Sequence, residues 1–254
     1  ADVALELSKQ ASIVIADRGY LRHQKLWRQT LGQRAACRVI QVESDVIVPV
    51  EVVSRKEEFA ARTIRPKIHV QLSEYLKPVK PLKIQRDSLD LKLGGLDLSD
   101  VNAALESLKL DRSVPISPDY HGGSDEAQKL LDVFLARKIN DYPELRNEPS
   151  KDYVSHLSPY LHFGQISPLD IALQVQAKRA TIRDEAYEAF LEELIVRREL
   201  SMNFCNFNPN YDRYDCLPTW AMNELDTHAK DPRKPSYSLE QLEAARTYDP
   251  YWNA

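Results

Sequence analysis

The first part of the chain follows a strand, helix, strand pattern that restricts how it can fold. The segment SIVIAD (12–17) is a short run rich in β-branched residues, and residues 19–33 carry apolar side chains at helical spacing. A second strand-rich stretch, CRVIQVESDVIVPV, follows at 37–50. Such a unit pairs its strands in parallel, with the helix crossing over one face. We therefore predict an α/β part that is a remnant of a parallel doubly wound sheet, because one or two strands cannot bury both faces of that sheet.

The pattern weakens between residues 77 and 117. Pro, Lys and Ser dominate the ends of this segment, KPVKPLKIQRDS and RSVPISPDYHGG, as in a connector between domains. We therefore expect the α/β part at 1–76, a linker at 77–117 and a second domain at 118–254. The chain begins inside a predicted helix, so we also expect residues upstream to be missing.

Helical spacing dominates the residues after the linker. Gly123 and Ser124 precede two acidic residues and then an apolar face, which is a helix start signal. The second domain is therefore predicted to be all-α, with further helices at 168–178, 184–204, 219–229 and 238–245.

The composition excludes several classes of protein. The 254 residues are 43% apolar with a net charge of -4, which argues against general coating of nucleic acid by positive charge. No run approaches the roughly 18 apolar residues of a membrane helix, and the start ADVALELSKQ lacks signal-peptide features. Cys37, Cys205 and Cys216 form no CxxC pair, so neither a disulfide framework nor a zinc site is indicated. We expect an intracellular, cytoplasmic protein without membrane association.

Positive charge is concentrated at residues 51–86, which contain nine Lys or Arg against four Glu. A solvated surface accounts for most of these side chains. A minority that faces phosphate groups is the alternative.

The predicted helix at 184–204 places charged residues on two faces. At about 100° per residue, Glu192, Glu199 and Asn203 share one polar stripe. Glu193 and Arg197 fall on the opposite, apolar side, four residues apart with the acid first, which favours an ion pair. This pair either neutralises itself at a helix packing seam or leaves Glu193 as a carboxylate in a dry pocket. In the second case Glu193 would hydrogen-bond a ligand N–H or act as an acid with a raised pKa.

The segment YVSHLSPYLHFGQISP (153–168) gathers polar and aromatic residues around one Gly. His156 and His162 are six apart without other ligands at suitable spacing, so no metal site is predicted. A nucleophile elbow is absent from the sequence, which leaves hydrolase chemistry unsupported. Ser155 and Ser158 can cap a helix start and offer hydroxyls to an anion. Trp252 suits packing, or electron relay if a redox cofactor binds.

Five separated motifs, taken together, resemble the class II cyclobutane pyrimidine dimer photolyases of the photolyase and cryptochrome superfamily. The resemblance covers nearly all of the chain except the linker, and the motifs occur in the family's order. They are ADRGYLRHQKLW, DVIVPVEVVSRKEEFAARTIRPKI, YPELRNEPSKDYVSHLSPYLHFGQISP, FLEELIVRRELSMNFCNFNPNYD and TYDPYWNA.

The resemblance implies a fold, a cofactor and an activity. The family has an N-terminal α/β domain and an all-helical domain that binds FAD without a covalent link. Its members split pyrimidine dimers, flipped out of ultraviolet-damaged DNA, by light-driven electron transfer from reduced FAD. A monomer in the cytoplasm, associated with the nucleoid when bound to DNA, is therefore expected, and the antenna chromophore is unknown.

The resemblance also assigns roles to residues of this sequence. Tyr142 and residues Val154, Ser155, His156, Leu157 and Ser158 match FAD-binding positions. Glu193 matches the acid that hydrogen-bonds the dimer, and Trp252 matches a Trp of the electron chain that reduces the flavin. The residues matching positions at the damaged strand are Arg146, Asn147 and Arg197.

The chain is shorter than the family pattern at both ends, so the resemblance implies a fragment with an incomplete FAD-binding domain. A cryptochrome-like blue-light receptor without repair activity and an inactive truncated fragment are the alternatives to a repair enzyme.

Overall fold

The computed structural model describes residues 2–88, 90–91 and 94–254. The residues outside this description are Ala1 and, within the predicted linker, Leu89, Lys92 and Leu93. The chain divides into two compact units, 1–207 and 208–254. Segments before and after the predicted linker 77–117 share the first unit, and the domain boundaries at 77 and 117 stay a prediction.

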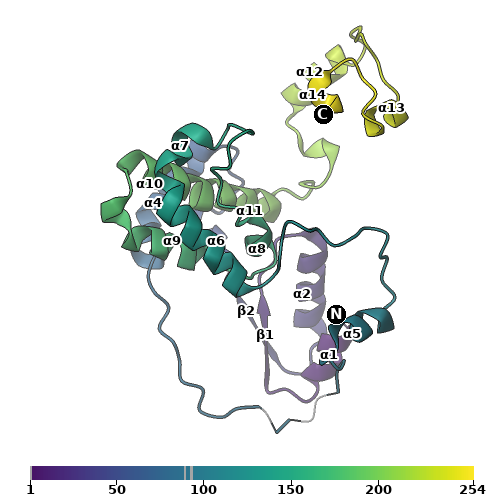
Figure 1. Ribbon diagram of the computed structural model, residues 1–254. Coiled ribbons are helices and arrows are strands. Elements are labelled where there is room, and N and C mark those ends of the chain that lie inside the picture. The colour runs from purple at the N-terminus through teal and green to yellow at the C-terminus, as the bar shows by residue number, and fades with distance from the viewer. Residues whose placement is uncertain (1, 89, 92–93) are drawn as a thin grey trace. The chain divides into compact units, whose positions relative to one another are not determined.

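The predicted parallel strand pair is confirmed. Strand β1 (Ile13–Asp17) pairs in parallel with β2 (Arg38–Val42), in a register that opposes Ile13 to Arg38. Helix α2 (Arg22–Arg34) connects the two strands, and α1 (Asp2–Ser8) lies next to it (Figure 1). The sheet of the described residues has only these two strands. The structure is thus compatible with a small α/β part followed by helices.

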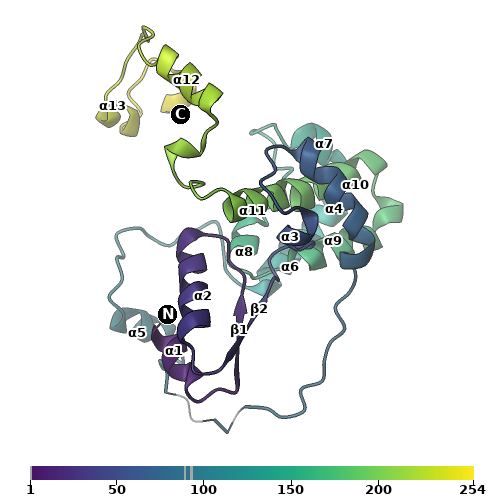
Figure 2. The same cartoon turned by 180° about the vertical axis from the view of Figure 1, so that it is seen from behind.

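The expectation that the second strand-rich stretch extends to residue 50 is wrong. Strand β2 ends at Val42, and residues 46–48 are buried without being paired in a sheet. The amides of Ile47 and Val48 donate instead to the carboxylate of Glu199. The β-branched run therefore fills a helical core, and it leads into the short helix α3 (Val50–Val53). Helix α3 lies next to α4 (Ala61–Tyr75) and α11 (Arg198–Phe207) (Figure 2).

Helices from both sides of the predicted linker form the main core. Helix α4 (Ala61–Tyr75) contributes Ile64 and Ile68, which are almost fully buried, and α6 (Ser124–Arg137) contributes Leu131 and Phe134. Helix α9 (Pro168–Ala177) adds Ile171. Along the chain, α5 (Val101–Ser107), which was not predicted, precedes α6. The turn η1 (Ile139–Asp141), α7 (Tyr142–Leu145) and α8 (Ser158–His162) follow α6, and the turn η2 (Arg179–Thr181) follows α9.

The predicted helix at 184–204 is not uniform. It consists of α10 (Asp184–Leu191), a π-helical stretch η3 (Glu192–Arg197) and α11 (Arg198–Phe207). The π-helical stretch changes the angular spacing of side chains, so a projection at constant α-helical spacing fails across it. Glu199 and Asn203 consequently lie in the core, 2% and 1% exposed.

The second unit contains three short helices. They are α12 (Thr219–His228), α13 (Leu239–Glu243) and α14 (Pro250–Asn253), preceded by the turn η4 (Tyr214–Cys216). Ser238 caps α13 and Asp249 caps α14 with side-chain oxygens. Helices were predicted at 219–229 and 238–245, and both are confirmed, the second in shortened form.

Candidate functional site

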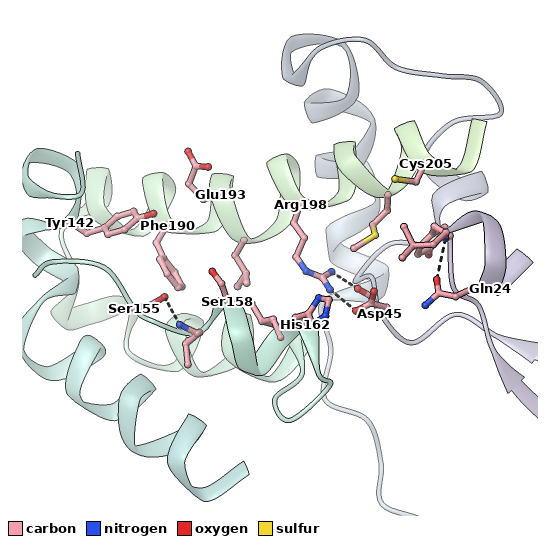
Figure 3. A pocket seen from close by; sticks show the side chains of 16 residues that line it. Gln24, Asp45, Tyr142, Ser155, Ser158, His162, Phe190, Glu193, Arg198 and Cys205 are labelled. Atoms are coloured by element: carbon pink, nitrogen blue, oxygen red, sulfur yellow. Dashed lines mark hydrogen bonds and ion pairs between the residues drawn. The ribbon is translucent and has the colours of Figure 1, made fainter. Parts of the chain in front are cut away.

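One pocket in the first unit brings together several residues that the sequence singles out. Its volume is about 560 Å³, within the range of small-molecule sites. The motif residues in its wall are Tyr142, Ser155, Leu157, Ser158 and Glu193 (Figure 3). They come from α7, from the loop before α8 and the start of α8, and from η3. Apolar side chains complete much of the wall, including Leu161, Phe190, Leu194 and Met202.

An aromatic cluster fixes one end of the pocket. Tyr142 contacts Phe134 and Phe190 edge to face, with ring centroids 5.6 Å apart in both pairs. Phe134 and Phe190 also contact each other at 4.8 Å. All three rings are buried, and such pairs prefer tilted or edge-to-face geometry. The ring of Tyr142 is therefore held rigidly in the wall by the core of the helical region.

Contacts outside the pocket lining hold the loop at 152–157. His156 has a left-handed backbone conformation, with φ of 56°, which is uncommon for a residue other than glycine. Its ring contacts Asp152 through Nε2 and the hydroxyl of Tyr120 through Nδ1. Asp152 also accepts from Lys138 at 2.7 Å, and the Lys138 and His156 bonds lower the pKa of Asp152. His156 thus shapes the loop by its backbone, although it does not line the pocket.

Glu193 pairs with a different cation from the one predicted. Its Oε1 accepts from Nη1 of Arg146 at 2.9 Å, so the expected ion pair with Arg197 is wrong. The guanidinium of Arg146 lies 5.3 Å from the ring centre of Tyr142, and contact with Tyr142, followed by Glu193, raises the pKa of Arg146. The Glu193 side chain is 41% exposed, so its surroundings are not the dry pocket that was one of the two alternatives for this residue. Two motif residues, Arg146 and Glu193, are thereby joined at the rim.

Arg197 binds the neighbouring acid instead. Its Nε donates to Glu192 at 3.1 Å, and Arg65 from α4 donates to the same carboxylate at 2.7 and 2.9 Å. These hydrogen bonds lower the pKa of Glu192, with Arg65 contributing more than Arg197. The basic segment 51–86 is therefore partly neutralised, and Lys67 is likewise paired, with Glu58.

The far end of the pocket was not predicted. Arg198 forms an ion pair with Asp45 at 2.5 Å, and both side chains lie in the wall together with Tyr20 and Gln24. Figure 3 shows this pair between the Ser158 side and the Gln24 side of the pocket. Asp45 and Arg198 are 153 residues apart, so no local spacing could have identified the pair. The adjacent Arg197 was selected by resemblance, but it does not line this pocket.

The remaining predicted residues lie outside this pocket. Val154 and Asn147 are exposed on the loops before α8 and after α7. Trp252 lies in the second unit, 56% exposed, where its indole N–H donates to the carbonyl of Leu242 at 3.0 Å. Within the described residues, no group of three or more His, Cys, Asp or Glu side chains is arranged to hold a metal ion. No helix among them is long and apolar enough to span a bilayer.

The donors in the pocket fit a cofactor such as FAD, which combines flat rings with hydroxyl and phosphate groups. The hydroxyl of Ser158 has no hydrogen-bond partner among the described residues and lies in the wall. Ser155 and Arg198 add further polar groups, while Leu157 and Phe190 supply apolar surface. This mixture of a mostly apolar wall with few polar groups is typical of cofactor sites.

Comparisons with known proteins identify relatives over almost the whole chain. No protein-family model matches the sequence. A deoxyribodipyrimidine photo-lyase of Methanothermobacter thermautotrophicus is 43% identical over 252 residues, which are 99% of this chain and 54% of that protein. Proteins of the same name from Potorous tridactylus and Arabidopsis thaliana are 37% and 38% identical. They match 95% and 96% of this chain and 45% and 50% of their own lengths.

A solved structure also aligns with this chain in its fold. The crystal structure of a bacterial class III photolyase from Agrobacterium tumefaciens aligns with a TM-score of 0.59 and 17% sequence identity. The alignment covers 96% of this chain and 50% of that chain. At this identity the similarity shows the fold alone. Over almost its whole length the sequence is similar to proteins named deoxyribodipyrimidine photo-lyase, and the chain spans about half the length of the curated relatives that it matches.

Proposed function

We propose that this chain is the part of a class II deoxyribodipyrimidine photolyase that holds FAD and contacts ultraviolet-damaged DNA. The observation that carries the proposal is the pocket that gathers Tyr142, Ser155, Leu157, Ser158 and Glu193. The family motifs select these residues from the sequence alone, and the residues are up to 51 positions apart along the chain. The names of relatives at 37–43% identity support the same function.

The proposed roles follow from the donors in the wall. Ser155 and Ser158 would bind polar groups of FAD with their hydroxyls, and Tyr142 and Phe190 would exclude water from one end. The chemistry supplied by bound, reduced FAD would be the light-driven transfer of one electron to the dimer and its return after the ring opens. The chain itself would orient the reactants and stabilise the added charge.

Glu193 and Arg146 would act on the dimer side of the pocket. The Arg146 guanidinium binds Oε1 of the Glu193 carboxyl, and Oε2, which has no hydrogen bond to the described residues, would meet a flipped-out base. A damaged pair is less costly to flip, since its pairing and stacking are already weakened. Arg146, Asn147 and Arg197 would contact the strand around the lesion, and the substrate is thus proposed to be DNA with an extrahelical pyrimidine dimer.

A light-dependent repair assay tests the proposal. The chain is incubated with FAD, a reductant and an irradiated oligonucleotide, and the loss of dimers is measured in blue light and in darkness. We expect repair by the unchanged chain, a clear reduction in Glu193→Gln, and no reduction in Glu188→Gln. Glu188 is an exposed acid on α10, so its variant makes the same change of charge outside the pocket.

The outcomes separate the alternatives. Bound flavin without light-dependent loss of dimers would contradict repair and favour a blue-light receptor. Protein that binds no flavin would contradict the proposed cofactor site. Equal repair by the unchanged chain and Glu193→Gln would contradict only the proposed role of Glu193, and not the proposed cofactor site.

A further inference from the structure

A buried carboxylate joins helix α11 to the segment after strand β2. Glu199 is 2% exposed, and its Oε1 accepts from the amides of Ile47 at 2.6 Å and Val48 at 3.2 Å. Its Oε2 is buried and has no hydrogen-bond partner among the described residues. Ile47 and Val48 are themselves 5% and 0% exposed. The carboxylate thus accepts the hydrogen bonds that carbonyl groups of a neighbouring strand would otherwise accept from these two amides.

The same segment carries one side of the pocket. Asp45 stands two residues before Ile47 and forms the ion pair with Arg198 in the pocket wall. Arg198 precedes Glu199 on the helix, so consecutive residues of the helix hold both parts of the stretch 45–48. The Asp45 backbone is fixed as well, because its carbonyl accepts from Arg198.

We propose that Glu199 is a positioning residue, whose carboxyl anchors residues 47–48 to α11 and thereby places Asp45 against Arg198 in the pocket wall. The expected effect of Glu199 on ligand binding rests on the proposed function, the binding of FAD in this pocket. The hydrogen bonds of the anchor lie within the chain, so they can be measured without a ligand.

The physical reason is that, among the described residues, Glu199 is the acceptor for both of these amides and no second acceptor is present. A buried N–H that loses its partner is costly, because water cannot replace the lost bond. When the acceptor is removed, the segment is expected to move outward until the amides of Ile47 and Val48 reach water. Asp45 moves with it, and the geometry of its bonds to Arg198 is lost.

The charges around Glu199 are consistent with an anchor at a buried site. Burial raises the pKa of Glu199 to about 7, while the amides of Ile47 and Val48 oppose the rise. Arg198 on the same helix also lowers it, and Glu43 in the loop after β2 raises it. The group is therefore held by geometry in a site that disfavours its charge.

Hydrogen exchange followed by NMR on the chain tests the anchor. In Glu199→Ala we expect the amides of Ile47 and Val48 to exchange at least about tenfold faster. The side-chain N–H resonances of Arg198 should shift because its partner has moved. Glu199→Gln keeps a carbonyl oxygen at the same place and is expected to restore both signals. If Glu199→Ala does not fold, Glu199→Asp withdraws the carboxylate by one methylene and makes the same test.

Asn203→Ala is the matched control, one turn further along the helix. Asn203 is 1% exposed, accepts from the amide of Glu58 at 2.7 Å and donates to the carbonyl of Lys56 at 3.1 Å. Its loss should accelerate exchange at Glu58 and leave Ile47 and Val48 protected. General loosening of the core would instead accelerate all three amides in both variants.

An FAD titration by flavin fluorescence completes the test. We expect weaker binding in Glu199→Ala and recovery in Glu199→Gln. Unchanged exchange at Ile47 and Val48 in Glu199→Ala would overturn the anchor. Faster exchange with unchanged Arg198 signals would overturn the positioning of Asp45. If none of the proteins binds FAD, the proposed function fails, while the exchange and the Arg198 signals still decide the anchor.

Discussion

Replacing Glu199 by Gln should change how the stability of the protein depends on pH. Burial raises the pKa of Glu199 to about 7 from its ordinary value of 4.5, despite the opposing amides of Ile47 and Val48. Between these two values the folded protein keeps a proton that the unfolded chain has released. The free energy of unfolding must therefore fall as the pH rises through this window. Glu199→Gln stays uncharged throughout, so it removes this contribution.

The shift sets the magnitude of the effect. It corresponds to about 3 kcal/mol at most, since each pKa unit is equivalent to about 1.4 kcal/mol. For a chain of this size, a change of 1 kcal/mol moves the melting temperature by roughly 2–4 °C. The variant should therefore gain up to roughly 6–12 °C relative to the unchanged protein between pH 5 and pH 8.

Thermal unfolding followed by circular dichroism at pH 5, 6, 7 and 8 measures the difference. Glu58→Gln is the control, because Glu58 is a buried carboxyl with the opposite shift. Burial alone would raise its pKa, but the hydrogen bonds from Lys67 and Ser54 lower it to about 2. The stability contributed by Glu58 is lost below pH 4.5, outside the window of Glu199. Parallel curves for Glu199→Gln and the unchanged protein would refute the reasoning.

Three further tests concern the core packing, the ion pairs of Glu192 and one buried hydrogen bond. Phe134→Ala removes a ring that is 1% exposed and touches Tyr142 and Phe190, so urea unfolding should show a loss of about 3–5 kcal/mol; a loss below about 1 kcal/mol would contradict this. Arg65→Ala should destabilise the protein more than Arg197→Ala, because Arg65 donates two bonds to Glu192 and Arg197 one; the reverse order in the same assay would refute it. Tyr20→Phe removes a buried hydroxyl that donates to Glu43 at 2.7 Å, and a loss of about 1–2 kcal/mol is expected; unchanged stability would show that the bond is not formed.

Local sequence patterns predicted the elements whose formation depends mainly on residues that are near one another in the sequence. The parallel pair β1 and β2 follows from two β-branched runs separated by a helical one, and α9 and α12 follow from apolar spacing with Pro near the start. The run at 45–50 has the composition of a strand, but the amides of Ile47 and Val48 donate to Glu199, which lies about 150 residues away. A rule that considers only neighbouring residues in the sequence cannot identify Glu199 as the hydrogen-bond partner.

The candidate site was predictable only in part, because several of its contacts also join residues that are far apart in the sequence. The resemblance selected Tyr142, Ser155 and Glu193, which line one pocket, but it could not supply the partner of Glu193. The π-helical stretch at 192–197 has no simple sequence signature, and it turns Arg197 toward Glu192 rather than Glu193. Asp45 and Arg198 meet only through the packing of α11 against the segment after β2.

We propose that the pocket of the first unit holds FAD, and a titration with a pocket-filling variant tests this binding most directly. Ser158→Trp places a large side chain in the wall at an exposed position, and Ser201→Trp makes the same change on the exposed surface of α11. Flavin fluorescence should show saturable binding of one FAD per chain to the unchanged protein and to Ser201→Trp. Binding to Ser158→Trp should be at least about tenfold weaker, equivalent to about 1.4 kcal/mol. Absence of saturable binding, or equal binding by all three proteins, would contradict the claim.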